Sequence, residues 1–294
     1  MPVSHFQAPR AAGAVTSAAR VSEAGTHWTV ADPAALAQRI RLRAVQMIAA
    51  QGFGYLGQAL SSAEQVAAMF AVARPGTDRI VCSPGHYVIA FYAAAAEVGL
   101  IPADALASYG RDGSELEAIG TERSPLFDYV GGSLGQGLSA AAGFALSDRL
   151  RGRDARTFAL VSDGELEEGQ LWEAAMFAAH HGLGALTVLV DANNSQVDGP
   201  VDTVTTIEPV AAKWASFGWH AVELDGHDAA AVTAALARPG RHGRPVVLIC
   251  RTSASHGLDC LPPDADRHFI KLPAELAALA AAELAGRLEE RPDA

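Results

Sequence analysis

Residues 157–194 decide the fold and read TFALVSDGELEEGQLWEAAMFAAHHGLGALTVLVDANN. Two apolar runs in this stretch, 157–163 and 186–194, have the length and composition of buried strands. Residues 168–181 between them carry apolar side chains at helical spacing. Two strands joined by a helix pair in parallel, because a parallel connection needs a long crossover. The stretch therefore predicts strand, helix and strand of one parallel sheet.

The same alternation continues on both sides of this stretch. Short apolar runs predict further strands at 78–83, 219–226 and 245–252. Helices are predicted from Asp32-Pro33, from about Ser62, from about Gly85 and over 138–151. The glycine-rich segment 52–60 is expected to be a turn. Together these elements predict an α/β fold, a mostly parallel sheet with helices on both faces.

The chain divides into three parts. Residues 1–31 are rich in Ala, Ser and Gly and lack periodicity, so we expect a loose N-terminal arm that orders only against a partner. Residues 32–272 hold the alternating strands and helices of the predicted domain. Residues 273–294 read as an Ala/Leu/Glu helix that packs on this domain.

Composition limits the partners and the compartment. The 294 residues carry 22 Lys and Arg against 33 Asp and Glu, a net charge of −11. Such a surface repels nucleic acid and anionic lipid, so neither is expected as a partner. The three cysteines form no C-x-x-C pair, the N-terminus lacks a secretory apolar segment, and no run reaches the roughly 20 apolar residues of a membrane helix. These features predict a cytoplasmic protein with reduced thiols.

Polar residues follow the two strands of the opening stretch. Asp163 and Gly164 end the first strand, and Asn193 ends the second. In a parallel sheet such strand ends meet at one edge, where ligands bind. Carboxylate and carboxamide oxygens suit Mg²⁺ (or Ca²⁺ or Mn²⁺), and a glycine lets a phosphate approach the backbone. The pair therefore predicts a divalent metal that anchors a diphosphate.

Plainer interpretations of these motifs stay open at the level of the residues alone. Asp-Gly and Asn-Asn after a strand also occur as ordinary turns. The glycines between 131 and 137 also suit close helix packing, and His86 also suits the start of a helix. The spacing of Asp163 and Asn193, each after an apolar strand, favours the site.

The segment 162–200 resembles the signature of thiamine diphosphate enzymes, a G-D-G motif followed about thirty residues later by N or N-N. The amino-acid sequence of this segment is most similar to that of the N-terminal subunit of split bacterial transketolases. The segments VGGSLGQGLSAAAGFAL (130–146) and SPGHYVIAFYAAAAEVG (83–99) resemble that family too. The resemblance covers about residues 35–272.

The resemblance implies roles for individual residues. Metal ligands would be Asp163, Asn193 and the backbone carbonyl of Ser195. Catalytic roles would fall to His86 and His256, and the subunit interface would include Glu168. Cofactor contacts would come from His86, Gly132, Ser133, Leu134, Asp163, Gly164, Glu165, Asn193, Ser195 and His256.

Three positions depart from the family pattern. Ser162 replaces the first glycine of G-D-G and is small enough to be tolerated. Tyr55 and Thr121 stand where transketolases carry substrate histidines, so the resemblance implies substrate positions for both. Since the cofactor carries out the carbanion chemistry, we expect these changes to alter the substrate and not the cofactor.

The resemblance also implies a partner. Transketolases have a further domain that binds the pyrimidine ring and carries the glutamate that activates the cofactor. We therefore expect a C-terminal transketolase-like subunit, in a heterotetramer of two copies of each chain. The expected reaction transfers a two-carbon ketol unit from a ketose, often phosphorylated, to an aldehyde. The alternatives are a component of a thiamine-dependent 2-oxo acid decarboxylase or dehydrogenase, and a cofactor-binding subunit without turnover.

Overall fold

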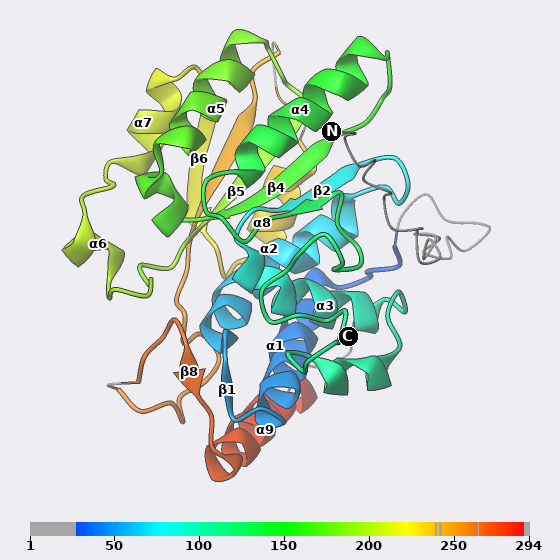
Figure 1. Cartoon of the computed structure of the whole chain (residues 1–294), viewed down its shortest axis with the longest axis vertical. Helices are drawn as coiled ribbons and strands as arrows, with labels where there is room; N and C mark the ends of the chain where they lie inside the picture. The colour runs from blue at the N-terminus through cyan, green and yellow to red at the C-terminus, as the bar shows by residue number, and fades with distance from the viewer. Residues whose placement is uncertain (1–27, 239, 241–242, 264, 291–294) are drawn as a thin grey trace, which may run out of the picture.

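The apolar runs of the opening stretch are the two central strands of a six-stranded sheet. The computed structural model describes residues 28–238, 240, 243–263 and 265–290. The strands are β2 (Arg79–Cys82), β3 (Tyr129–Val130), β4 (Thr157–Ser162), β5 (Leu186–Ala192), β6 (His220–Asp225) and β7 (Val246–Arg251). Their order is β3-β2-β4-β5-β7-β6, and every neighbouring pair is parallel (Figure 1). The prediction of a parallel α/β sheet is confirmed.

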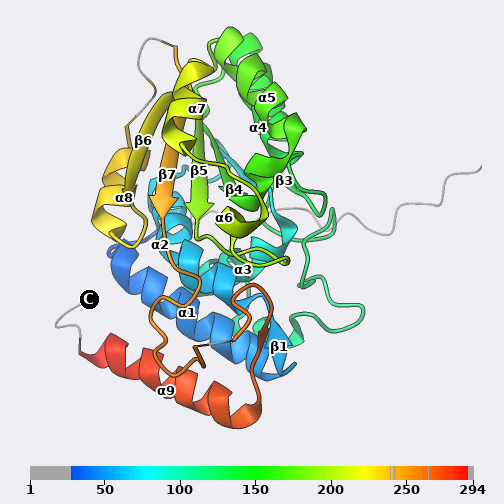
Figure 2. The same ribbon diagram turned by 90° about the vertical axis from the view of Figure 1, so that its left-hand side faces the viewer.

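Helices cover both faces of this sheet, as predicted. One face carries α4 (Gly137–Leu150), α5 (Gly169–His180) and α7 (Val210–Ser216), which pack on Val161, Val188 and Val190. The other carries α2 (Leu56–Val72), α3 (Val88–Glu97) and α8 (Ala229–Leu236), which pack on Phe158, Leu160 and Leu189. Successive side chains of a strand point to opposite faces of the sheet, so each apolar strand contributes side chains to the core on either face. Figure 2 shows α4 and α5 on one side of the strands and α2 and α8 on the other.

Helix α2 begins earlier than the sequence predicted. The segment 52–60 was expected to be a turn with the helix starting near Ser62, but α2 starts at Leu56. The glycine that suggested a turn is helical: a Cβ on Gly57 would lie 1.9 Å from the backbone oxygen of Arg267. This glycine therefore allows a close approach of two chain segments and does not end a helix.

Helices α1 (Pro33–Ala49) and α9 (Ala274–Glu289) form a further layer below α2 and α3. The N-cap of α1 is Asp32, whose side chain accepts from the backbone N–H groups of Ala34 and Ala35 at 2.8 and 3.1 Å. An antiparallel pair, β1 (Phe53–Gly54) with β8 (Ile270–Lys271), lies beside this layer. The remaining short elements are η1 (Gly85–Tyr87), η2 (Ala103–Ser108), η3 (Gly164–Glu167) and α6 (Val201–Val204).

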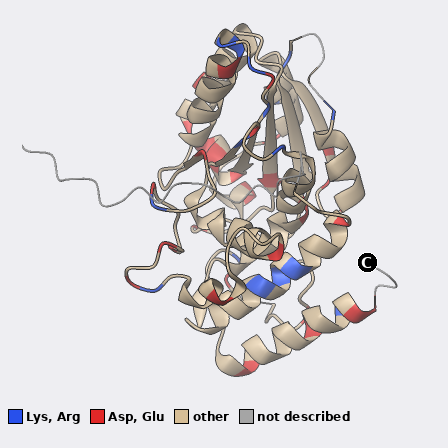
Figure 3. Cartoon of the chain, turned by 90° about the vertical axis from the view of Figure 1, so that its right-hand side faces the viewer, with Lys and Arg blue, Asp and Glu red and all other residues tan. Residues whose placement is uncertain are grey.

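Both ends of the described chain pack on the apolar core between the sheet and helices α2, α3 and α8. Most of the predicted arm lies outside the described residues, but Trp28 packs on Phe70 with ring centroids 4.8 Å apart. In α9, Ala280 and Leu284 are fully buried in the same core as α1. Asp and Glu residues are scattered along the ribbon in Figure 3. In the part of the chain that the structure describes, no helix is long and apolar enough to cross a membrane.

Candidate active site

The carboxyl ends of four parallel strands, β2, β3, β4 and β5, converge on one pocket of about 320 Å³. The segments that follow these strands form most of its walls, which is where ligands bind in such sheets. Tyr55 and His268 complete the lining. A second cavity of about 470 Å³ lies on the other side of the segment 195–198, which lines both. The first pocket is lined by Tyr55, His86, Tyr87, Gly132, Leu134, Ser162, Asp163, Gly164, Glu167, Glu168, Ser195, Gln196, Val197, Asp198 and His268.

Asp163 follows directly on β4 and is 3% exposed. Its carboxylate accepts from the backbone N–H of Gly164 at 2.9 Å and of Asn194 at 2.6 Å. Burial, and then the negative charge of Asp191, raise the pKa of Asp163 to about 7. A buried carboxyl whose ionised form is this costly favours a bound cation.

Asn193 lies beside Asp163 because Ser162 pairs with Asp191 across the two central strands. It is buried, and its Oδ1 accepts from the backbone N–H of Ser195 at 2.9 Å. Asn193 lines the second cavity, and Ser195 lines both. The structure thus brings together the predicted trio of Asp163, Asn193 and Ser195, although their role as metal ligands stays a prediction.

Asp191 is a site residue that the sequence analysis missed. It is fully buried at the end of β5, two residues before Asn193. Its carboxylate accepts from the Nδ2 of Asn193 at 2.9 Å and from the hydroxyl of Tyr87 at 2.8 Å. An acid inside an apolar strand run was the signal available in the sequence, because such a group needs partners when it is buried.

Glu165 does not line the pocket, in contrast to its predicted contact with the cofactor. It is fully buried, and its carboxylate accepts from the backbone N–H of Gly135 at 2.8 Å and of Ser162 at 3.0 Å. The hydroxyl of Ser83 also donates to it at 2.5 Å. Burial raises the pKa of Glu165. Its observed contacts hold the loop 131–136 against the end of β4.

The pocket that Asp163 lines also has an aromatic wall. It consists of Tyr55, His86 and His268, with ring centroids 5.0–5.8 Å apart. Burial, and then the neighbouring His268, lower the pKa of His86 to about 3, so its imidazole is neutral at physiological pH. Tyr55 comes from the start of α2, which places this predicted substrate position in the pocket.

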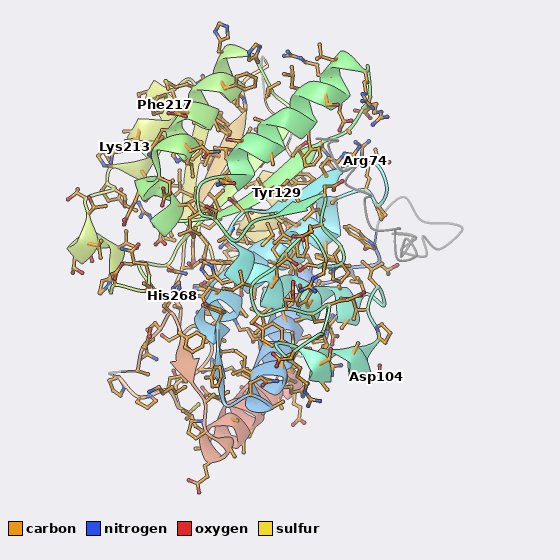
Figure 4. The ribbon with its side chains drawn as sticks, viewed as in Figure 1. Arg74, Asp104, Tyr129, Lys213, Phe217 and His268 are labelled. Atoms are coloured by element: carbon orange, nitrogen blue, oxygen red, sulfur yellow. The ribbon has the colours of Figure 1, made fainter. Side chains whose placement is uncertain are left out.

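His268 was also missed, since its loop has no periodicity or motif that singles it out. It precedes β8, and Figure 4 shows it between the lower edge of the sheet and that strand. Its Nδ1 lies 3.0 Å from the Nε2 of Gln58 in α2. Burial lowers the pKa of His268.

His256 was predicted as a catalytic and cofactor-binding residue, but it lines neither cavity. Its ring stacks on that of His227 at 3.6 Å, beside the buried Glu64. The Nδ1 of His227 lies 3.2 Å from Glu64, and its Nε2 accepts from the backbone N–H of Ser253 at 2.9 Å. Arg41 forms an ion pair with the same Glu64 oxygen at 2.5 Å. These contacts engage Glu64 Oε2 and both ring nitrogens of His227, and we interpret the cluster as an internal support of the 253–257 turn.

Two further predicted residues lie outside the lining of the pocket. The hydroxyl of Thr121 donates to Glu117 on a surface loop. Ser133 is exposed, whereas its neighbours Gly132 and Leu134 line the pocket. Glu168, the predicted interface residue, is exposed at the N-cap of α5 and forms part of the pocket rim.

Comparison with known proteins agrees with this geometry. Residues 33–279 match the family model described as "Transketolase, thiamine diphosphate binding domain". This chain belongs to the transketolase family. The expected resemblance is confirmed, and the comparisons favour the transketolase expectation over the two alternatives.

Two transketolase relatives have nearly the length of this chain. An uncharacterized transketolase family protein of Sinorhizobium fredii is 41% identical, over 80% of this chain and 89% of its own length. A 6-deoxy-6-sulfo-D-fructose transketolase subunit of a Clostridium species is 35% identical, over 83% of this chain and 93% of its own. Human transketolase is 29% identical and is matched over only 42% of its length.

Solved transketolases share the fold. The Campylobacter jejuni transketolase superposes with a TM-score of 0.78 at 23% identity, over 86% of this chain and 42% of that one. The Leishmania mexicana transketolase gives a TM-score of 0.71 at 25% identity, over 90% and 43%. The chain therefore spans less than half of the solved enzymes it matches.

Proposed function

We propose that this chain is the diphosphate-binding subunit of a two-component transketolase, a transferase that moves a two-carbon ketol unit from a ketose or ketose phosphate to an aldehyde. The observation that carries the proposal is the position of Asp163 and Asn193 at the ends of adjacent strands. They follow Ser162 and Asp191, which pair between β4 and β5, and Gly164 comes next to Asp163. When bound, thiamine diphosphate supplies the carbanion chemistry that ketol transfer needs.

The residues present fit a magnesium diphosphate. Asp163 offers a carboxylate and Asn193 a carboxamide, both buried, and Mg²⁺ takes oxygen ligands of these kinds together with phosphate oxygens. Gly164 has no side chain to cover the backbone, and a Cβ there would lie 3.0 Å from the Oε1 of Gln196. The carbonyl of Ser195 is the third protein ligand in this proposal.

The aromatic wall would handle the substrate. His86 is a neutral imidazole and can accept or donate one proton at a ring nitrogen. His268 lies 5.0 Å from it, between ring centroids, and offers a second imidazole. Tyr55 offers one hydroxyl, and burial raises its pKa, so it remains a donor rather than an anion. These groups would orient the substrate hydroxyls and carbonyl above the metal end.

A partner subunit would complete the site. The chain is matched over less than half the length of the solved transketolases, and the relative from Clostridium is named a subunit. We propose that a C-terminal transketolase-like chain supplies the pyrimidine-binding domain and the activating glutamate. Glu168 and Leu134, exposed on the pocket rim, would face this partner in a heterotetramer of two copies of each chain.

The test is ketol transfer by the purified pair. Co-expressed chain and partner should turn over xylulose 5-phosphate or a non-phosphorylated ketose in the presence of Mg²⁺ and thiamine diphosphate. The chain alone should not. Asp163→Ala should lower cofactor affinity by at least a hundredfold, because a diphosphate without its metal bridge leaves uncompensated charge in the site. Calorimetric titration of the cofactor checks this.

Each other outcome has a definite meaning. Release of CO₂ from pyruvate without ketol transfer would assign the pair to 2-oxo acid chemistry. Unchanged cofactor affinity in Asp163→Ala would place the site elsewhere. His181→Gln, at the far end of α5, is a control that should bind cofactor normally.

A further inference from the structure

The carboxamide of Asn193 is held in one orientation by a network centred on Asp191. The Nδ2 of Asn193 donates toward three oxygen atoms: Asp191 Oδ2 at 2.9 Å, Ser61 Oγ at 3.1 Å and Tyr87 Oη at 3.1 Å. The Oδ1 lies at the opposite end of the amide, where it accepts from Ser195. The oxygen and the N–H groups of this amide therefore face different surroundings.

The direction of these hydrogen bonds depends on Asp191. The hydroxyls of Ser61 and Tyr87 each have a single hydrogen. Tyr87 donates it to Asp191 Oδ2 at 2.8 Å, and Ser61 donates it to the same oxygen at 2.5 Å, much nearer than the backbone oxygen of Gln58 at 3.3 Å. Their oxygens are thereby left as acceptors, and these are the atoms that Asn193 donates to. If the amide were turned over, its oxygen would meet three oxygens that have no hydrogen to offer.

Asp191 accepts hydrogen bonds on its other side as well. Its Oδ1 accepts from Gln65 Nε2 at 2.8 Å and from Thr252 Oγ1 at 2.6 Å. Asp191 is fully buried, and its side-chain partners among the described residues are all neutral. Five donors are sufficient to hold a buried carboxylate that only accepts.

We propose that Asp191 is a positioning residue for metal binding: it commits the hydroxyls of Ser61 and Tyr87 and so directs the carbonyl oxygen of Asn193, rather than its N–H, to the cation. This inference rests on the proposed function, because it assigns a role toward the same metal diphosphate. Asp191 touches neither cavity and acts only through Asn193.

The decisive variant is Asp191→Asn, which keeps the shape of the side chain and removes the charge. The hydroxyls of Ser61 and Tyr87 are then free to donate to Asn193, and the amide can turn. The Mg²⁺ affinity of the full chain with its partner, titrated at saturating thiamine diphosphate, should fall at least tenfold. Asp78→Asn is a matched control, because Asp78 is also a buried acid but lies before β2, at the opposite edge of the sheet.

The outcomes separate this inference from the proposed function. Loss of Mg²⁺ affinity in folded Asp191→Asn, with less than a twofold change in Asp78→Asn, supports the inference. Unchanged affinity in Asp191→Asn, or an equal loss in both variants, overturns it while leaving the proposed function intact. A wild-type pair that binds no Mg²⁺ and thiamine diphosphate overturns both.

A second pair of substitutions decides the matter if Asp191→Asn does not fold. Ser61→Ala combined with Tyr87→Phe removes two acceptors of the Asn193 amide and leaves the carboxylate in place. Mg²⁺ affinity should fall several-fold in this double variant. Wild-type affinity there overturns the inference.

Discussion

At the scale of single residues, Asp163 shows how a binding group makes folding more costly. Its folded-state pKa of about 7 lies above the ordinary value of 3.8, because it is buried beside the charge of Asp191. The folded chain therefore keeps a proton on Asp163 that the unfolded chain has lost, between about pH 4 and pH 7. Stability contributed by this group falls as the pH rises through that window.

Asp163→Asn should remove this loss in the cofactor-free chain. The free energy of unfolding of the variant minus that of wild type should be larger at pH 8 than at pH 5 by on the order of 2 kcal/mol, because each pKa unit corresponds to about 1.4 kcal/mol. Urea unfolding of both proteins at the two pH values measures the change. The side-chain amide of Asn does not titrate between these pH values. Any hydrogen bond that it fails to make therefore costs the same at both, and the cost cancels in the comparison. A stability difference that is constant with pH would contradict the prediction.

The positions of site residues could be predicted where a motif places them at strand ends. Asp163, Gly164 and Asn193 are of this kind, because the end of a parallel strand has a fixed position in the fold. His268 could not be predicted, since a long irregular loop carries it to the pocket. His256 was predicted from its SASHG context; its ring stacks on His227 outside the two cavities, and its role stays a prediction.

At the scale of elements, the contact between α2 and the loop before β8 positions the aromatic wall. Gly57 touches the backbone of Arg267 directly, and Tyr55 and His268 lie on either side of this contact. The helix start and the loop therefore cannot shift independently.

Gly57→Ala should disturb this contact. A Cβ at 1.9 Å from a backbone oxygen forces the loop to move, with a cost of about 1–3 kcal/mol. The shift should also lower the activity of the pair through His268. Gly286→Ala in α9 is the control: nothing lies within 4 Å of its Cβ, so it should gain up to about 1 kcal/mol from helix propensity. Thermal unfolding compares the two, and a neutral Gly57→Ala would argue against the tight contact.

Most long elements could be predicted from the sequence, because the spacing of their apolar residues reflects the side that each element buries against its neighbours. The strands at 157–162 and 186–192 and the helices on either face are of this kind. The two-residue strands β1 and β8 and the early start of α2 were missed, because they depend on a contact between segments more than two hundred residues apart. A local pattern does not contain that information.

At the scale of the whole molecule, the cofactor should stabilise the fold by joining its strand ends. The complex of Mg²⁺ with thiamine diphosphate, at about a hundred times its dissociation constant, should add roughly 2.7 kcal/mol. The melting temperature should then rise by about 5 °C for a chain of this size. Scanning calorimetry with and without ligand tests this, and Asp163→Ala should show no rise. An equal rise in that variant would mean that the ligand binds elsewhere.

The antiparallel β1–β8 pair has a consequence for how this enzyme can diversify. Asp163 and Asn193 follow the central strands, whereas Tyr55 and His268 flank a small pair of strands outside that sheet. Neither Tyr55 nor His268 belongs to the buried apolar core. Evolution, or a mutant library confined to Tyr55 and His268, can therefore explore new ketoses and aldehydes without substitutions at Asp163 or Asn193.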